Sequence, residues 1–344
     1  MTTAAQNNEM HTLLDWNLKR NPEGGELVIA ELMHQNNQFT QIVPFREAND
    51  GVGHKVGVRT SLPQAHLSAY GLRHKASHST TAVITEPTAF AVTWAKVNAD
   101  LAELNGGDPA ILSEAAPHAE ALAQLVENAM VNGDHVTDPL EPVGLAIRHS
   151  SLSGEAGKVT IDGGGTTNLQ SIYLVGMGPG AVYGIFPKGS KTAGIQSDYI
   201  GKVSDQNDDG ELLVHKWRWS QKFGLAEEDH RFTQRIANIS LSDLEAGTGT
   251  TKNLIYLMKK ARARVQSRFR IKVGPQGINH YWLMSSKMFE YLLHQIDSAV
   301  SQGSGIRYEN VDNGFLKNVT MPTFMGVPII FSEQILDGTE ELVS

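Results

Sequence analysis

Residues 45–81 read FREANDGVGHKVGVRTSLPQAHLSAYGLRHKASHSTT, a long polar stretch that is rich in basic residues and histidine. Two pieces of it are β-prone, His54 to Thr60 and Ser77 to Val83, and Gly, Asn, Asp and Pro turn residues join them. Ordering about thirty-five residues costs about 1 to 2 kcal/mol of backbone entropy each, which the few apolar side chains cannot offset. The stretch therefore needs support from the rest of the chain, from a ligand or from a neighbouring copy of the protein.

The charge of this stretch is opposite to that of the remaining chain. Its five basic and two acidic residues give it a net charge of +3, which leaves −11 for the rest of a chain whose total is −8. The charged residues are Arg46, Lys55, Arg59, Arg73 and Lys75, with Glu47 and Asp50. An acidic chain argues against a nucleic-acid-binding surface over the whole molecule, and the two parts can attract each other.

The bulk composition is that of a folded, sheet-rich protein. The 344 residues are 40% hydrophobic and 19% charged, and 33 glycines indicate many tight turns. The absence of cysteine excludes disulfides, thiolate zinc sites and cysteine nucleophiles. The N-terminus lacks the apolar core of a signal peptide, and four glycines and a proline interrupt the most apolar stretch, residues 172–186, so we expect no membrane segment.

The periodicity of apolar residues predicts helices and strands without a regular βαβ alternation, which favours the α+β class. We expect two short amphipathic helices within residues 10–35, a helix over 90–104 and a longer one over 108–132. In the longer one, Asp108 caps the N-terminus, Pro109 occupies the first turn, and Pro117 predicts a kink or a start near Ala116. Further strands are expected at 169–175, 181–186, 211–219, 279–284 and 327–331, and further helices at 250–272 and 286–300.

Glycine-rich segments suggest nucleotide binding but have the wrong context. Gly176-Met177-Gly178-Pro179-Gly180 follows a strand, yet β-prone residues rather than a helix come after it, so a strand-turn-strand hairpin is favoured. Gly189-Ser190-Lys191 has the wrong residue order for a phosphate-binding Walker loop. We therefore predict no cofactor site.

Three further groups have simpler structural explanations than chemistry. Asp205 to Gly210 matches half of a calcium loop, but Lys216 stands where a bidentate Glu is needed, so a hairpin turn is favoured. Glu227 to Arg231 is interpreted as a solvated strand edge rather than an acid/base site. The histidines of the 45–81 stretch lack metal-ligand spacing and are interpreted as surface or interface donors.

The basic helix at 250–272 is the strongest functional alternative. Its cations include Lys259, Lys260, Arg262 and Arg264, and they alternate with an apolar stripe that would face the core. Such a helix can contact nucleic acid, or it can pair with the acidic body of a neighbouring subunit. The sequence favours the two about equally.

Several segments, in sequence order over nearly the whole chain, resemble the major capsid proteins of tailed podophages. They are Thr12 to Trp16, Ile29 to Leu32 with Asn36-Asn37, Gly53-His54, Val58 to Pro63, Lys75 to Thr81, Ser171 to Gly176, Val182 to Ser190, Gly224 to Ile239 and Phe324 to Ile329. The extra Thr192-Ala193, His230 and Phe232 in place of bulkier aromatics, and residues 302–320 depart from that pattern.

The resemblance implies the tailed-phage capsid fold of the Hong Kong 97 type. On that basis we expect an N-terminal arm (1–44), an extended loop (45–81), a peripheral domain (82–138) with a spine helix at 108–132, a mainly axial domain (139–320), and a C-terminal strand that returns to the body (321–344). We call residues 45–81 the extended loop from here on.

The function that the resemblance implies is a self-assembling shell, with no enzymatic activity and no cofactor. Copies would form hexamers and pentamers that close into an icosahedron around double-stranded DNA, in a virion assembled in the host bacterial cytoplasm. A portal protein and scaffold or cement proteins would be further partners. The extended loop would cross onto an adjacent subunit, and we predict contacts there from Lys55, Arg59, Arg73 and Lys75.

Overall fold

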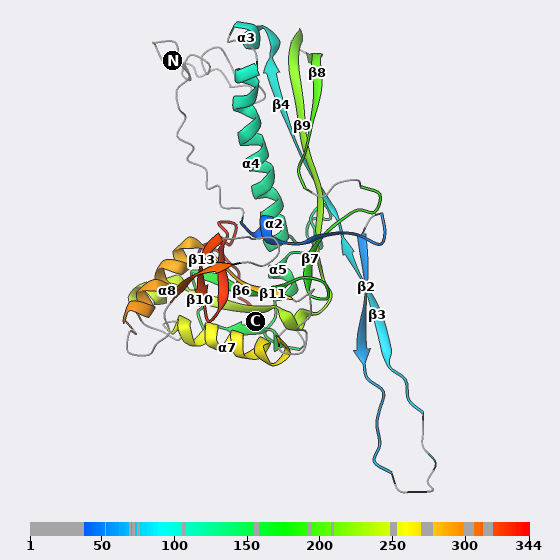
Figure 1. Ribbon diagram of the computed structural model, residues 1–344, viewed down its shortest axis with the longest axis vertical. Coiled ribbons are helices and arrows are strands. Elements are labelled where there is room, and N and C mark those ends of the chain that lie inside the picture. Colours follow the sequence, from blue (N-terminus) through cyan, green and yellow to red (C-terminus); the bar gives the residue numbers. More distant parts are fainter. Residues whose placement is uncertain are drawn as a thin grey trace.

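The computed structural model describes residues 38–344 apart from short gaps, and Figure 1 shows their arrangement. The gaps are residues 52, 69, 71–72, 74–75, 105–107, 155–157, 191–193, 208–209, 248–252, 270–277, 299–305 and 312–318. The two short helices expected within residues 10–35 lie outside the described residues.

The central strand of the body, β6 (Leu169–Met177), is buried along its whole length. Successive side chains of a strand point to opposite faces of the sheet. Ile172 and Leu174 accordingly belong to one hydrophobic cluster, while Tyr173 and Val175 belong to another. A hydrophobic core on each side explains why the sequence of this strand is mostly apolar instead of alternating.

Twelve strands among the described residues form one continuous sheet around β6. Along its main path the order is β12-β13-β14-β11-β6-β7-β9-β4, with β1 beside β7, β10 beside β6, β5 beside β10 and β8 beside β9. The body strands are β1 (Phe45–Glu47), β5 (Thr160–Asp162), β7 (Val182–Phe186), β10 (Gln234–Ser240), β11 (Asn279–Met284), β12 (Arg307–Val311), β13 (Val319–Phe324) and β14 (Val327–Phe331). The strands expected at 169–175, 181–186, 279–284 and 327–331 are therefore confirmed.

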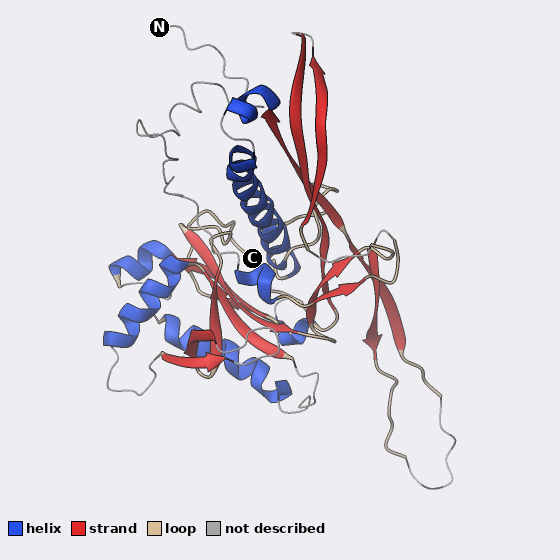
Figure 2. Ribbon diagram, turned by 45° about the horizontal axis from the view of Figure 1, so that its top comes forward, coloured by secondary structure: helices blue, strands red, loops and turns tan. Residues whose placement is uncertain are grey.

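Helices cover both faces of the body sheet (Figure 2). On one face lie α7 (Leu254–Phe269) and α8 (Ser286–Ser298), and on the other lie α2 (Gln38–Ile42) and the C-terminal half of α4 (Asp108–Asn132). The shorter helices are α5 (Leu145–Arg148), η2 (His230–Phe232) and α6 (Leu241–Ala246). Among the described residues, no helix is long and apolar enough to cross a membrane. This mixture of helices and strands confirms the α+β prediction.

The long helix α4 stands upright beside a separate part of the sheet (Figure 1). Its 25 residues match the predicted spine helix from end to end, with Pro117 inside it, and they span about 37 Å. Beside it, β9 (Gly210–Glu227) pairs with β4 (Ala89–Asn98) and β8 (Gln196–Asn207), and its last residues continue into the body to pair with β7. The β9 strand therefore joins the upright sheet to the body.

The helix predicted over 90–104 is wrong for most of its length. Residues 89–98 form β4, and only Ala99–Leu104 are helical, as α3. Ala91 and Ala95 of β4 point into the core, while Phe90 and Trp94 lie on the opposite, exposed face. Since both faces carry apolar side chains, the two-residue period of the strand is hidden and a helical spacing fits by chance.

The expected hairpin at residues 176–180 is also corrected. These residues do form a turn between two strands, in which Gly178 and Gly180 have positive φ angles of 140° and 82°. However, β6 and β7 run parallel and share only the Met177–Val182 bridge. The β7 strand instead takes its main partners from β1 and β9, because the turn sends the chain onward rather than back along β6.

The last residues of the chain are fastened to the body. Asn238 donates its side-chain amide to Val343 O and accepts from Val343 N, both at 2.9 Å. The buried Arg235 guanidinium lies 3.3 Å from Glu340 Oε2 and donates to Ser171 Oγ at 2.9 Å. These bonds hold the C-terminal segment against β6 and β10.

The domain boundaries expected at residues 139 and 320 stay a prediction. Strand pairing groups residues 196–223 with β4 and α4 rather than with the body. A division by strand partners would therefore place the β8–β9 hairpin in the peripheral part.

Candidate functional site at the base of the extended loop

The extended loop is a two-stranded ribbon that leaves the body and ends in an unsupported tip (Figure 1). Strands β2 (Gly53–Ser61) and β3 (Thr80–Pro87) pair with each other in a separate antiparallel sheet. Beyond them, the side chains of Leu62, Leu67 and Tyr70 are 75%, 106% and 108% exposed. Apolar groups this exposed on a projecting segment are typical of a surface that another molecule covers.

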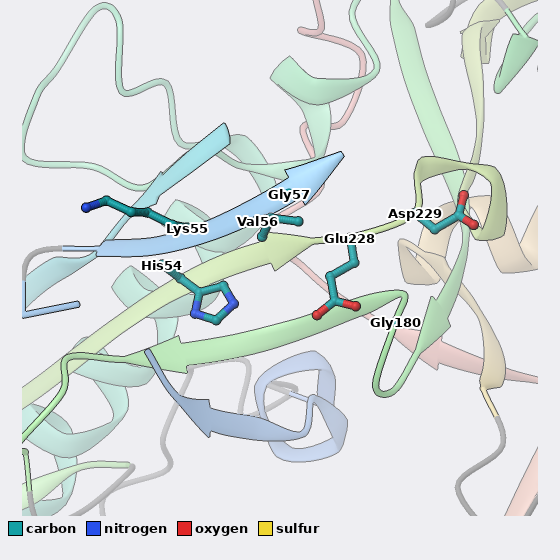
Figure 3. A pocket seen from close by; sticks show the side chains of 7 residues that line it. All are labelled: His54, Lys55, Val56, Gly57, Gly180, Glu228 and Asp229. Atoms are coloured by element: carbon teal, nitrogen blue, oxygen red, sulfur yellow. The ribbon is translucent and has the colours of Figure 1, made fainter. Parts of the chain in front are cut away.

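A pocket of about 430 Å³ lies where the ribbon joins the body (Figure 3). It is lined by His54, Lys55, Val56 and Gly57 of β2, by Gly180 of the turn before β7, and by Glu228 and Asp229 after β9. In Figure 3 the side chains of His54 and Glu228 point into the same space, while Lys55 points away. The pocket therefore lies between the base of the ribbon and the end of β9.

A chain of three side chains crosses this pocket. The Tyr183 hydroxyl donates to Glu228 Oε1 at 2.8 Å and lies 2.9 Å from His54 Nε2. Because the Asn49 N–H donates to His54 Nδ1 at 3.2 Å, a neutral His54 carries its proton on Nε2 and donates to Tyr183. Burial, followed by the hydrogen bond to Glu228, raises the pKa of Tyr183. These bonds connect β2 to β7 and to the end of β9.

A buried ion pair fastens the other strand of the ribbon. Arg148 of α5 donates two hydrogen bonds of 2.6 Å to the Glu86 carboxylate on β3, in the bidentate geometry that suits a guanidinium. The two side chains are only 11% and 3% exposed. Arg148 also donates to Val143 O and to Leu225 O, so one side chain joins α5, β3 and β9.

Glu227 and His149 form a second buried pair behind the first. Their Oε1 and Nε2 atoms lie 3.4 Å apart, in a contact that is close enough for charge attraction but is not a well-aligned hydrogen bond. Burial opposes ionisation of Glu227, but His149, Arg148 and Thr233 outweigh it and lower its pKa to about 2. The interpretation of residue 227 as part of a solvated edge is therefore wrong, because its side chain faces the core.

Each charged group of this site is occupied in holding elements together. The ion pairs and the Tyr183 bonds connect the ribbon to α5, β7 and β9, which fixes the direction in which the extended loop leaves the body. We call this set of contacts the joint at the base of the extended loop.

The cations predicted to contact another subunit are placed differently from one another. Lys55 forms a 2.9 Å ion pair with Asp50 of its own chain, and both side chains are about half exposed. Arg73 is exposed at the tip. Arg59 lies on β2, where the structure describes its backbone only. Lys75 lies outside the described residues.

The basic helix α7 presents fewer free cations than its sequence predicts. Arg264 donates to the backbone oxygens of Lys158 and Thr160 at 3.3 and 3.2 Å. Arg262 is half-buried, and burial lowers its pKa. Lys260 is exposed and Lys259 is half-exposed, so these two remain on the outer side of the helix.

The other candidate motifs have structural roles. Asp205 to Asn207 end β8 and pair antiparallel with the start of β9 at Gly210, and the Asp205 carboxylate binds Lys96 at 2.8 Å and lies 3.8 Å from Lys216. This confirms the hairpin interpretation, and Lys216 helps to neutralise the acidic side chain. Within the described part of the chain, no cluster of His, Asp or Glu could hold a metal ion.

The outer face of the upright sheet is a second exposed apolar surface. Phe90, Val92 and Trp94 of β4 project from the face opposite α4. Lys216 and Arg218 of β9 lie 5.2 and 5.9 Å from the centre of the Trp94 ring, in cation–π contacts. The indole is thus prepared for partial burial beside cations.

Sequence reasoning missed Glu86, Arg148 and Tyr183. One signal was available, because Glu86 lies between two apolar runs, Ala82 to Ile84 and Ala89 to Val92. An ionisable residue between β-prone apolar runs is a candidate for a buried ion pair. Its partner Arg148 is 62 residues away, in a four-residue helix with no distinctive pattern.

Comparisons with known proteins agree with this architecture. A family model described as Major capsid protein GP7 matches residues 21–344. The structure of bacteriophage Epsilon15 is 19% identical, aligns over 99% of both chains and gives a TM-score of 0.68. The capsid of bacteriophage JBD30 is 11% identical over 89% of this chain and 96% of its own, with a TM-score of 0.42. The SrpI encapsulin of Synechococcus elongatus is 10% identical over 67% and 96%, with a TM-score of 0.44. A search of curated protein sequences gives no match.

The upright helix and sheet, the layered body and the projecting ribbon, together with the Epsilon15 match over the whole chain, define the Hong Kong 97 type capsid fold. The match over residues 21–344 makes the assignment more specific. The chain belongs to the Major capsid protein GP7 family. It is a non-enzymatic virion protein that forms the icosahedral shell of a phage, as the sequence resemblance implied.

Proposed function

We propose that copies of this chain assemble into hexamers and pentamers around packaged double-stranded DNA, and that the extended loop of each copy lies on an adjacent copy. The observation that carries this proposal is the loop tip, where no part of the chain that the structure describes covers Leu62, Leu67 and Tyr70. In a shell, each copy has an adjacent copy that can cover these exposed side chains. Burying these side chains would offset the entropy of ordering the tip.

Charge supports the same arrangement. The loop is positively charged and the remaining chain is acidic, so a loop is attracted to the body of a neighbour. Lys55, Arg59, Arg73 and Lys75 are the cations we assign to this contact. Lys55 would exchange or share its Asp50 partner when the neighbour arrives.

The test separates folding from assembly. Arg73→Glu and Lys55→Glu should leave the melting temperature of the isolated subunit unchanged, since both side chains are largely solvated, and should reduce the fraction that sediments as shells. Lys287→Glu on α8 makes the same charge change outside the loop and serves as the control. If all three variants assemble as well as the wild type, or if the loop variants lose stability equally, the proposed role of the loop cations is wrong.

Further partners follow from the family relationship rather than from the geometry. We assign a portal protein, and scaffold or cement proteins, as candidates, and we treat contact with packaged DNA as non-specific proximity. Expression of the chain alone, followed by electron microscopy, tests the first point. Closed shells of uniform size would show that scaffold and cement proteins are dispensable, and irregular aggregates would support a requirement for them.

A nucleic-acid-binding module on α7 is the alternative function, and the engagement of Arg262 and Arg264 within the chain reduces its support. Of the four cations named for this surface, Lys259 and Lys260 lie on the outer side of the described helix. If they bind phosphates, the double variant Lys259→Ala/Lys260→Ala should lower the salt dependence of DNA binding by about one unit of slope per lost contact. Salt-independent binding, or none, would eliminate this alternative.

A further inference from the structure

Glu127 occupies an unusual position on the spine helix. It lies on α4 where α2 and the residues after β14 meet, and its side chain is completely buried. The Ser332 hydroxyl donates to Glu127 Oε1 at 2.5 Å, and the Thr40 N–H of α2 lies 3.5 Å from Oε2. One carboxyl group therefore binds segments that are nearly three hundred residues apart in the sequence.

The three elements have few other polar connections at this junction. Gln38 accepts from the Phe331 N–H at 3.2 Å, which joins α2 to β14, and Asn132 donates to Gln334 O at 2.7 Å, which joins α4 to the same segment. Among the described residues, the Thr40 and Phe39 N–H groups of α2 donate to the Glu127 carboxyl of α4, and apolar packing of Phe39 and Ile42 accompanies these contacts. The attachment of α2 to the spine helix thus depends strongly on the state of one carboxyl.

The surroundings favour the neutral carboxyl. The ionisable neighbour that acts on Glu127 is Glu120 of α4, which has the same charge, and α2 contains no ionisable residue. Glu333 follows Ser332 but accepts instead from the Ser286 hydroxyl, so among the described residues no cation faces the site. Burial raises the pKa of Glu127 to about 7, against the opposing hydrogen bonds from Ser332, Thr40 and Phe39.

We propose that Glu127 is a proton-controlled latch, which holds α2 on the spine helix when its carboxyl is protonated and releases α2 when the carboxyl ionises. The three donors that face the carboxylate do not offset the hydration that a full charge loses on burial, so ionisation favours a state in which α2 has moved away and water reaches the carboxylate. α2 leads into β1 and the extended loop, so the latch controls how firmly the segment before the loop is attached to the spine helix. This inference concerns a local equilibrium within one subunit and does not depend on the assembly proposal.

The sign and size of the effect follow from the two protonation equilibria. The carboxyl has a pKa of about 7 in the closed latch and the ordinary value of 4.5 when solvated. The opening equilibrium is therefore flat below pH 4.5, rises above it, and levels off above pH 7. Between pH 5 and pH 9 it should increase on the order of 100-fold, since one pKa unit corresponds to a tenfold change.

The test is amide hydrogen exchange of the full-length chain between pH 5 and pH 9, with each rate corrected for intrinsic exchange. In the wild type, protection of residues 39–43 should fall on the order of 100-fold, while protection in α8 stays constant. Glu127→Gln keeps the shape of the side chain and one accepting oxygen but cannot ionise, so it should abolish this pH dependence. Glu120→Gln, a matched change on the same helix, should retain it.

Three results would overturn the proposal. They are equal pH profiles in the wild type and Glu127→Gln, a parallel loss of protection in α2 and α8, and constant protection of α2 in the wild type. The last two need only the wild-type protein, so the latch remains refutable if Glu127→Gln does not fold.

Discussion

Replacement of Arg148 by methionine should loosen the joint at the base of the extended loop. Methionine fills much of the volume of the arginine stem but removes the guanidinium. The change breaks both 2.6 Å bonds to Glu86 and the bonds to Val143 O and Leu225 O. The Glu86 carboxylate is then left buried and unpaired, and two backbone oxygens lose a donor.

The expected loss in the free energy of unfolding is about 3 to 5 kcal/mol, the usual cost of removing one partner of a buried ion pair. Little of this is lost to solvent screening, since the side chains of Arg148 and Glu86 are 11% and 3% exposed. The double variant Arg148→Met/Glu86→Leu removes both charges, and its stability should lie closer to the wild type than that of either single variant.

Urea denaturation of the isolated subunit, followed by tryptophan fluorescence, measures these differences. Lys55→Met breaks the exposed Lys55–Asp50 pair on the same ribbon and should cause no measurable change. The reasoning is refuted if Arg148→Met costs less than about 1 kcal/mol, which is the range of an exposed pair. It is also refuted if the double variant is less stable than both single variants.

Three other predictions concern acid stability, the upright sheet and the C-terminus. The pKa of Glu227 is about 2 in the folded chain against 4.5 unfolded, so its stabilisation of about 3 kcal/mol is complete above pH 4.5 and disappears as the pH falls towards 2. Urea titrations at a series of pH values measure this loss of stability in acid. Glu227→Gln should flatten the dependence of stability on pH in this range, and an unchanged dependence would contradict the prediction. Trp219→Ala should cost about 3 to 5 kcal/mol of subunit stability, because Trp219 is only 4% exposed. Trp94→Ala should cost clearly less stability, because Trp94 is 42% exposed, and should impair assembly. Denaturation and sedimentation measure the two effects, and equal effects of the two variants in both assays would be inconsistent with this assignment. Asn238→Ala removes two hydrogen bonds to Val343 at a residue with a φ angle of 57°, so we expect a loss of about 2 to 3 kcal/mol in the free energy of unfolding. Carboxypeptidase should also digest the C-terminus of this variant faster. Unchanged digestion would refute the role of these bonds in holding the C-terminal segment.

The spine helix over residues 108–132 and the strands at 279–284 and 327–331 were predictable from the sequence and have the expected bounds. The helix has a start signal at Asp108-Pro109 and ends before Gly133. The two strands are buried on both faces, so each is a short continuous apolar run. The β4 strand was not predictable, since its apolar side chains lie on both faces and those of one face are exposed among the described residues. Apolar residues on both faces hide the two-residue period of a strand.

The candidate site could be predicted only in part. The extended loop was identified because its few apolar side chains cannot offset the entropy of ordering it. This can be seen in the composition of one continuous segment. The joint at its base could not be found, because Glu86, Arg148 and Glu227 come from three distant segments and meet only in the fold. The interpretation of Glu227 failed for the same reason, since its charged neighbours in the sequence are half-buried or exposed, whereas Glu227 is buried.

A cryo-electron microscopy map of the assembled shell tests the central claim most directly. We predict that residues 61–79 of each copy lie on an adjacent copy and that Leu67 and Tyr70, fully exposed in the single chain, are buried in that contact. A shell in which this segment points into solvent, or folds back on its own subunit, would contradict the account.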